Sequence, residues 1–121
     1  ETGGFTAFVP WSFKPGNTPL QKHIKAHAGP TRYLRMIAFS RIYLDNLPHV
    51  QASWFSEGKK TGQIALHFGA DDFGGTLFEE NVHAATTFVN TTTIEDLVTL
   101  IQESGFQPAQ RTTLYDILRE H

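Results

Sequence analysis

The strongest chemical signal lies in segment 69–82, which holds four carboxylates and three glycines in a run that alternates like a β-strand. With a period of two residues, Asp72, Thr76 and Glu80 fall on one face and Phe73 on the other. Ordinary strands avoid acidic residues and glycine, so this composition predicts the wall of a polar cavity. A carboxylate placed there could hydrogen-bond a hydroxyl group or transfer a proton.

The carboxylates of this segment have different predicted roles. Glu80 stands at the carboxyl end of the strand and is the candidate catalytic group, although a solvated loop acid is an equally good interpretation. Asp71 is explained more simply as a turn residue. Asp72 is expected to hydrogen-bond at the floor of the cavity, because a buried carboxylate without partners is too costly. The glycine pair 74–75 would admit a ligand or a neighbouring backbone, or form a bulge.

Composition excludes several classes of protein. The chain has 121 residues, an apolar content of 40% and a formal net charge of -2, so we expect a single segment, 1–121, without a basic surface for nucleic acid. No apolar run could span a bilayer and no signal peptide is evident, which predicts a cytoplasmic protein with no membrane partner. The chain contains no cysteine, so it cannot build a thiolate site by itself. His23 and His27 lack a third ligand at a zinc spacing, and no metal site is assigned.

Strands and helices alternate in the expected fold. Thr31 and Thr93 stand where helix N-caps belong, and Thr93 opens a capping box with Asp96. Alternation predicts parallel pairing, and three parallel strands leave two open edges that need further strands. Because polar inner faces suit a lumen, we expect an α/β fold, the last three β/α units of a TIM-type β/α barrel. The expected strands are 5–9, 50–55 and 69–82, the expected helices are 32–44, 60–68 and 94–104, and a helical turn is expected at 114–118.

Position within such a barrel selects further candidates. The chemistry of β/α barrels lies at the carboxyl ends of their strands. In this chain those ends are Trp11 and Phe13, then 53–57, then 78–81. Periodicity also places a set of polar side chains on the inward face of the strands. They are Gln51, Ser53, Thr76 and Glu80.

Four stretches of the chain carry a resemblance to a known family. They are Gly4–Phe13, Val50–Trp54, Gly69–Val82 and Gly105–Tyr115. Together they resemble the C-terminal part of the cyclic dehypoxanthine futalosine synthases. These are radical S-adenosylmethionine enzymes of the futalosine route to menaquinone, related to aminofutalosine synthase and to the deazaflavin-forming synthases. The resemblance covers nearly the whole chain. It has two departures, at Asp71, where asparagine is expected, and at Thr86, where glycine is expected.

The resemblance implies a cofactor that this chain cannot hold alone. In the family, three cysteines of an N-terminal CxxxCxxC loop bind a 4Fe-4S cluster, which cleaves S-adenosyl-L-methionine. The resulting radical removes hydrogen from C4′ of the substrate ribose, and the sugar radical adds to the benzoate ring of the substrate. Loss of an electron and a proton then gives the cyclic product, with Glu80 as the candidate proton acceptor. The cysteine-free chain is therefore expected to be inactive without an N-terminal part.

The resemblance also implies a nucleoside-like substrate and a set of residues that bind it. Arg111 could pair with the substrate carboxylate, or form a helix-end salt bridge instead. The remaining half of the barrel, or a second chain, is expected to pair with the open edges. Two alternatives stay open, namely a sister enzyme of the superfamily and a non-catalytic module that binds a small molecule. The predicted substrate-binding residues are Trp11, Phe13, Gln51, Ser53, Trp54, Asp72, Thr76, Glu79, Asn81 and Arg111.

Overall fold

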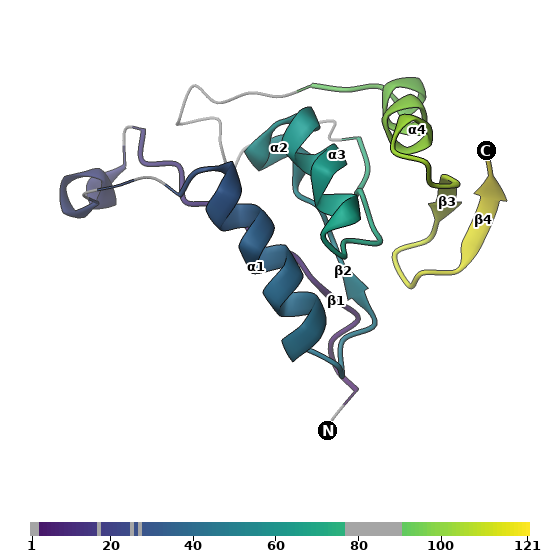
Figure 1. Cartoon of the computed structure of the whole chain (residues 1–121), viewed down its shortest axis with the longest axis horizontal. Helices are drawn as coiled ribbons and strands as arrows, with labels where there is room; N and C mark the ends of the chain where they lie inside the picture. Colours follow the sequence, from purple (N-terminus) through teal and green to yellow (C-terminus); the bar gives the residue numbers. More distant parts are fainter. Residues whose placement is uncertain (1–2, 17, 25, 27, 77–90) are drawn as a thin grey trace.

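The computed structural model describes residues 3–16, 18–24, 26, 28–76 and 91–121 (Figure 1). In Figure 1, α1 lies across β1 and β2, the α2–α3 pair lies beside it, and α4 with the β3–β4 hairpin forms the other end of the molecule. The elements in chain order are β1 (Ala7–Phe8), the 3-10 helix η1 (Pro19–His23), α1 (Pro30–Tyr43), β2 (His49–Val50), α2 (Trp54–Glu57), α3 (Lys59–His67), α4 (Ile94–Glu103), β3 (Ala109–Arg111) and β4 (Ile117–Glu120).

A small parallel sheet confirms the predicted α/β class. β1 pairs with β2 in parallel, with Phe8 opposite Val50, and one parallel bridge joins Gln51 to Asp72. Both strands are shorter than the expected strands 5–9 and 50–55. β2 cannot extend through 55, because the chain turns into α2 directly after Ser53. In the described part of 69–82, regular pairing is limited to this bridge, since Gly74 takes a positive φ of 73° that bends the strand.

Helix α1 covers one face of this sheet with three side chains spaced by about one turn. Tyr33, Ile37 and Ser40 are all buried, and Ile37 is packed with Val50 in the main core. The expected N-cap at Thr31 is wrong. The helix begins two residues earlier than expected, at Pro30 with Gly29 as its N-cap, because proline lacks the N–H that an N-cap would satisfy and has a suitable φ. The apolar core consists of Tyr33, Ile37, Val50, Ala52, Trp54, Phe55, Ala65, Leu66, Ala70, Phe73 and Leu97.

The next two long helices match their predictions to within one residue. Helix α3 ends at His67, followed by Gly69 with a φ of 106°, a conformation that favours glycine after a helix. Helix α4 has Thr93 as its N-cap, whose side chain accepts the Asp96 N–H at 3.1 Å. The Asp96 carboxylate also forms an ion pair with the Lys59 ammonium, with 3.0 Å between Oδ2 and Nζ, and this pair joins α4 to α3.

The C-terminal segment forms an antiparallel hairpin, so the helical turn expected at 114–118 is wrong. β3 pairs with β4, with an irregular register at Arg111. The turn between them is held by the Thr112 hydroxyl oxygen, which accepts the N–H groups of Leu114 at 3.2 Å and Asp116 at 3.1 Å. Side-chain bonds of this kind compete with helix formation. The small parallel sheet is therefore followed by an antiparallel element that periodicity did not predict.

Candidate functional site

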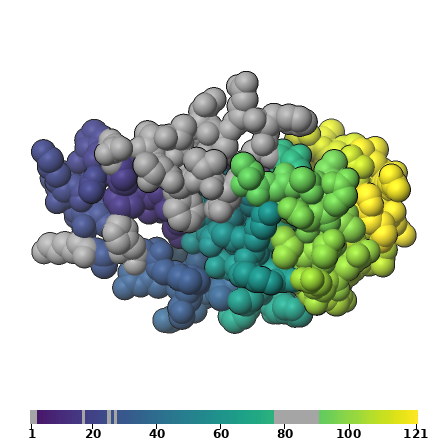
Figure 2. Space-filling view, turned by 90° about the horizontal axis from the view of Figure 1, so that it is seen from above, coloured from purple at the N-terminus to yellow at the C-terminus, as the bar shows by residue number. Residues whose placement is uncertain are grey.

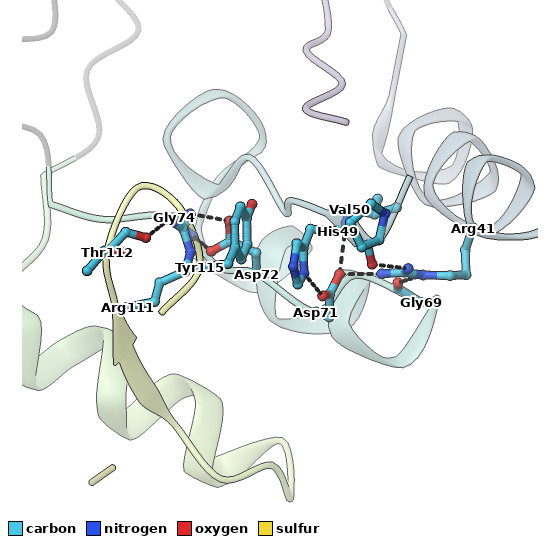
Figure 3. Close-up of polar contacts among 11 residues, drawn as sticks. Arg41, His49, Val50, Gly69, Asp71, Asp72, Gly74, Arg111, Thr112 and Tyr115 are labelled. Atoms are coloured by element: carbon cyan, nitrogen blue, oxygen red, sulfur yellow. Dashed lines mark hydrogen bonds and ion pairs between the residues drawn. The ribbon is translucent and has the colours of Figure 1, made fainter. Parts of the chain in front are cut away.

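A polar cluster joins the C-terminal hairpin to the parallel sheet (Figure 3). Its centre is Asp72, which is only 8% exposed. The Asp72 Oδ2 atom accepts hydrogen bonds from the Arg111 guanidinium and, at 2.8 Å, from the Tyr115 hydroxyl. Its Oδ1 atom accepts the Gly74 N–H at 2.9 Å. We call Asp72, Arg111 and Tyr115 the hairpin clamp. The prediction that Asp72 is hydrogen-bonded is confirmed.

The ring of Tyr115 lies between a cation and an imidazole. The His49 ring stacks on it with centroids 3.5 Å apart and planes at 1°, and the Arg111 guanidinium carbon is 4.0 Å from its centroid (Figure 3). Burial, together with the hydrogen bond to the Asp72 carboxylate, raises the pKa of Tyr115, which therefore remains a hydroxyl donor. Burial opposes the charge on Arg111, but its hydrogen bond and ion pair with Asp72 prevail and raise the Arg111 pKa.

The neighbouring carboxylate, Asp71, serves the backbone and helix α1 instead. Its Oδ1 atom accepts the Val50 N–H at 2.8 Å and the Arg41 guanidinium, and its Oδ2 atom lies 2.6 Å from Nδ1 of His49. Burial alone would raise the pKa of Asp71, but the hydrogen bonds from Val50 and His49 and the Arg41 charge lower it. Arg41 also donates to the Gly69 carbonyl at 2.6 Å. These contacts give Asp71 a structural role, although its partners lie in β2 and α1 and not in a local turn.

The carboxyl ends of β1 and β2 form a second cluster. Ser53 is fully buried, and both of its donors are used within the fold. The Ser53 hydroxyl donates to the Pro10 carbonyl at 2.8 Å, and its N–H donates to the Tyr33 hydroxyl at 2.7 Å. Burial raises the pKa of Tyr33. Trp11 contacts Phe55 edge-on at 4.9 Å, with their planes at 84°. The carboxyl edge therefore combines the aromatic pair Trp11–Phe55 with Ser53, whose donors are satisfied within the fold.

Glu57 belongs to this edge, and sequence analysis did not select it as a site residue. Its side chain is only 4% exposed, and its Oε1 atom accepts the Ser12 N–H at 3.1 Å and the Ser56 hydroxyl at 2.9 Å. The Lys14 ammonium lies 3.6 Å from the same oxygen. The only sequence signal for Glu57 was its place within 53–57, directly after a strand. We call Trp11, Ser12, Ser53, Phe55 and Glu57 the carboxyl-edge cluster.

The structure does not gather the predicted binding residues at one site. Trp11 and Phe13 are 49% and 41% exposed at the carboxyl edge, whereas Trp54 is buried, and its indole N–H has no hydrogen-bond partner among the described residues. Asp72 and Arg111 contact each other, although 39 residues separate them. Gln51 lies against Gly74, where an added Cβ would come within 2.7 Å of the Gln51 amide nitrogen. Glu79, Glu80 and Asn81 lie outside the described residues.

A cavity of about 650 Å³ lies between segment 70–76, helix α4 and the hairpin, and Thr76 is part of its lining.

Within the described residues, no three His, Asp or Glu side chains gather as a metal site would require. No helix of the described part of the chain is long and apolar enough to cross a membrane.

Comparison with known proteins identifies the family. The family model described as "CofH/MqnC C-terminal region" matches residues 2–121. The chain belongs to this family. It is 43% identical to the cyclic dehypoxanthine futalosine synthase of Streptomyces coelicolor, with 100% of this chain and 30% of the relative covered. It is 44% identical to the synthase of the same name from Halalkalibacterium halodurans, over 98% of this chain and 32% of the relative.

Members of the family with other names are about as similar. A 5-amino-6-(D-ribitylamino)uracil–L-tyrosine 4-hydroxyphenyl transferase from Methanopyrus kandleri is 44% identical over 96% of this chain and 33% of its own length. The aminodeoxyfutalosine synthase of S. coelicolor is 40% identical over 100% of this chain and 34% of its own. The chain spans about a third of the length of these curated relatives. The resemblance noted in the sequence is confirmed at the level of the CofH/MqnC family, whose relatives are named as enzymes.

Proposed function

We propose that this chain is the C-terminal, substrate-side part of a radical S-adenosyl-L-methionine enzyme that cyclises dehypoxanthine futalosine in menaquinone biosynthesis. The observation that carries the proposal is the match to two cyclic dehypoxanthine futalosine synthases, at 43% and 44% identity over 98–100% of the chain. The transferase and aminodeoxyfutalosine synthase types are the competing candidates, because their identities of 44% and 40% are close. A non-catalytic module is not favoured, since these relatives are named as enzymes.

The sheet supports a role as the last three units of a β/α barrel. β1, β2 and the Asp72 segment are neighbouring parallel elements, with helices α1 and α3 in the connections between them. In the proposed enzyme, the rest of the barrel pairs with both open edges of this sheet. The carboxyl-edge cluster then lies at the catalytic mouth, as in other barrels of this class.

The residues of this chain do not fit a 4Fe-4S cluster, because such clusters are held by cysteine thiolates and the chain contains none. In the proposed enzyme, the cluster and S-adenosyl-L-methionine therefore belong to the preceding part of the longer protein. What this chain supplies is substrate contact. The exposed rings of Trp11 and Phe13 offer stacking surfaces for a nucleoside-like molecule. The indole N–H of Trp54, which has no partner in the described part of the chain, is a further candidate hydrogen-bond donor.

Polar groups have separate roles in the proposed site. Glu80 is the candidate proton acceptor, with Glu79 and Asn81 beside it in the sequence as candidate substrate ligands. Asp72 and Arg111 already neutralise each other, which favours a structural role for this pair over pairing with a substrate carboxylate.

A chimera tests the function and the choice of member. The chain would replace the matching C-terminal 30% of the S. coelicolor cyclic dehypoxanthine futalosine synthase, and separately the matching 34% of its aminodeoxyfutalosine synthase. We expect the first chimera to convert dehypoxanthine futalosine to its cyclic product and the second to be inactive in its own reaction. Activity of the second chimera alone would assign the chain to the sister enzyme.

Within the active chimera, Glu80→Gln tests the proposed base. We expect the turnover rate to fall about 100-fold or more, the usual size of a lost acid or base, with little change in KM. Glu95→Gln, on the exposed surface of α4, is the matched control. Equal rates for the two variants would exclude Glu80 as the proton acceptor.

A further inference from the structure

Loop 10–14, which follows β1, carries the two exposed aromatic rings of the carboxyl edge. Trp11 is 49% exposed and Phe13 is 41% exposed, and the polar residues Ser12 and Lys14 alternate with them. The loop forms neither helix nor strand, so no regular backbone pairing fixes where its rings lie. Contacts with a neighbouring element must fix them instead.

Glu57, the last residue of α2, holds this loop at two points. The Ser12 N–H donates to its Oε1 atom at 3.1 Å, and the Lys14 ammonium lies 3.6 Å from the same oxygen. These two partners stand on either side of Phe13 in the chain, and Ser12 directly follows Trp11. One carboxylate therefore fixes the stretch of backbone that carries both rings.

The surroundings of Glu57 are those of a group that holds a loop. Its side chain is only 4% exposed, and a carboxylate at that depth is unfavourable unless donors and an opposite charge surround it. The Ser56 hydroxyl donates to Oε1 as well, at 2.9 Å. Because Ser12, Lys14 and Ser56 already meet at Oε1, this oxygen is used within the fold and is a poor acceptor for a proton from a substrate.

A second contact from α2 orients one of the rings. Phe55 meets Trp11 edge-on, with centroids 4.9 Å apart and planes at 84°, and Phe55 itself is only 8% exposed. Figure 2 shows the purple N-terminal part of the chain and the yellow hairpin at opposite ends of the molecule. The position of the rings therefore depends on α2 and not on the hairpin clamp.

We propose that Glu57 is a positioning residue of the substrate site. By holding loop 10–14, it keeps the Trp11 and Phe13 rings where they stack on a planar part of a nucleoside-like substrate. The inference rests on the proposed function, because it takes the carboxyl edge as the mouth of the site. A group that only holds stacking surfaces helps to bind the substrate and the transition state equally. Its loss therefore raises KM and leaves kcat nearly unchanged.

Glu57 variants of the active chimera test this role. We expect Glu57→Ala to raise KM about tenfold or more and to change kcat less than about threefold. Glu57→Gln keeps an oxygen that accepts the Ser12 and Ser56 donors, so its KM should stay within about threefold of the wild type. A proton acceptor would instead lose kcat in both variants. Leu97→Ala, in the core beside the hairpin end, is the control for a general loss of stability, and its KM should not change.

A variant without the two rings tests whether Glu57 acts through them. Trp11→Ala combined with Phe13→Ala should raise KM at least as much as Glu57→Ala does. Adding Glu57→Ala to this variant should then raise KM less than about twofold further, because residues that act through one surface are not additive.

Amide hydrogen exchange measures the loop contact in the same chimera, whether or not it turns over substrate. In Glu57→Ala, exchange at Ser12 should accelerate about tenfold or more, because its N–H loses its acceptor. Exchange at Gln51, whose N–H donates to the Phe8 carbonyl at 2.9 Å, is the internal control and should not change.

Four results would overturn the proposal. They are unchanged exchange at Ser12, a further tenfold rise in KM when Glu57→Ala is added to the variant without the rings, an equal loss of kcat in the Ala and Gln variants, and an equal rise of KM in Leu97→Ala. If both chimeras are inactive, it is the proposed function that fails. Accelerated exchange at Ser12 would then still support the loop contact, and unchanged exchange would overturn it.

Discussion

The contacts of the small parallel sheet with the helices and with the C-terminal hairpin depend on different forces. On the helix side, the contacts are apolar, and Ile37, Val50 and Ala52 are completely buried. On the hairpin side, the contacts are an ion pair, a hydroxyl bond and stacked rings, centred on Asp72 and Tyr115. Burial of apolar area is strong and non-directional, whereas polar contacts contribute little net stability and depend on geometry.

This difference suggests that the apolar contacts provide most of the folding stability, whereas the polar contacts position the hairpin. On the helix side, apolar packing holds α1 on the sheet but does not by itself fix one exact orientation, because apolar burial is non-directional. The hairpin clamp instead specifies one arrangement, because the Arg111 guanidinium and the Tyr115 hydroxyl must both reach the same carboxylate oxygen, Oδ2 of Asp72. We therefore expect helix-side substitutions to change global stability most, and clamp substitutions to release the hairpin while the helix-side core remains folded.

The largest effect is expected on the helix side. Ile37→Ala removes a side chain with no exposed surface and leaves a cavity, so we expect the free energy of unfolding to fall by about 3 kcal/mol. Ile42→Ala is the control on the same helix, because Ile42 is 81% exposed, and a change under about 0.5 kcal/mol is expected. Urea unfolding followed by circular dichroism measures both. Similar losses in the two variants would contradict the assignment of the α1 core face.

The next effect concerns the clamp. Asp72→Ala leaves the partly buried Arg111 guanidinium without its carboxylate, and we expect a loss of about 2 kcal/mol. Amide exchange should accelerate in β3 and β4 much more than in α1. Asp45→Asn, at an exposed residue outside the clamp, serves as the control. Equal acceleration of exchange in the hairpin and in α1 would show that the hairpin and the helix-side core unfold together.

Tyr115→Phe keeps the stacked ring and removes only the hydroxyl bond to Asp72, so we expect a loss of about 1 kcal/mol near pH 7. The pKa of Tyr115 is raised in the folded chain, so the stabilisation is complete below the unfolded value of 10.0 and is lost as pH rises through the folded pKa. The wild-type chain should therefore lose more stability above pH 10 than the Phe variant. If the free energy of unfolding of the wild type and of the Phe variant showed the same pH dependence, the Tyr115 hydroxyl would not be buried against Asp72.

The smallest effect is expected at Asp71, whose side chain is 40% exposed and thus screened by solvent. Asp71→Asn should cost about 0.5 kcal/mol at pH 7. Because the folded pKa is below the ordinary 3.8, the contribution is present above that pH and disappears as pH falls through the folded value. The variant and the wild type should therefore converge as the pH falls below 3.8 and through the folded pKa of Asp71. A constant difference down to pH 2 would mean that the carboxylate charge has no part in the interaction.

Local patterns predicted the helices well, because periodicity and capping act over a few residues. The interval Lys59–His67 and the Thr93 cap agree closely with expectation. The C-terminal hairpin was missed, since the Thr112 bonds that hold its turn have no strong composition signal. Strand lengths were overestimated, because alternation continues through residues where the chain already turns into α2.

The sequence by itself determined the α/β class, the family resemblance and the lack of cluster ligands, because each depends on residue types and on spacing along the chain. Only the tertiary structure decided the partners of the two adjacent aspartates. Asp71 holds β2 and α1, whereas Asp72 holds Arg111 and Tyr115, 39 and 43 residues away. Partners so distant in sequence are brought together by the packing of whole elements, and no local pattern encodes which of two neighbouring carboxylates will meet them.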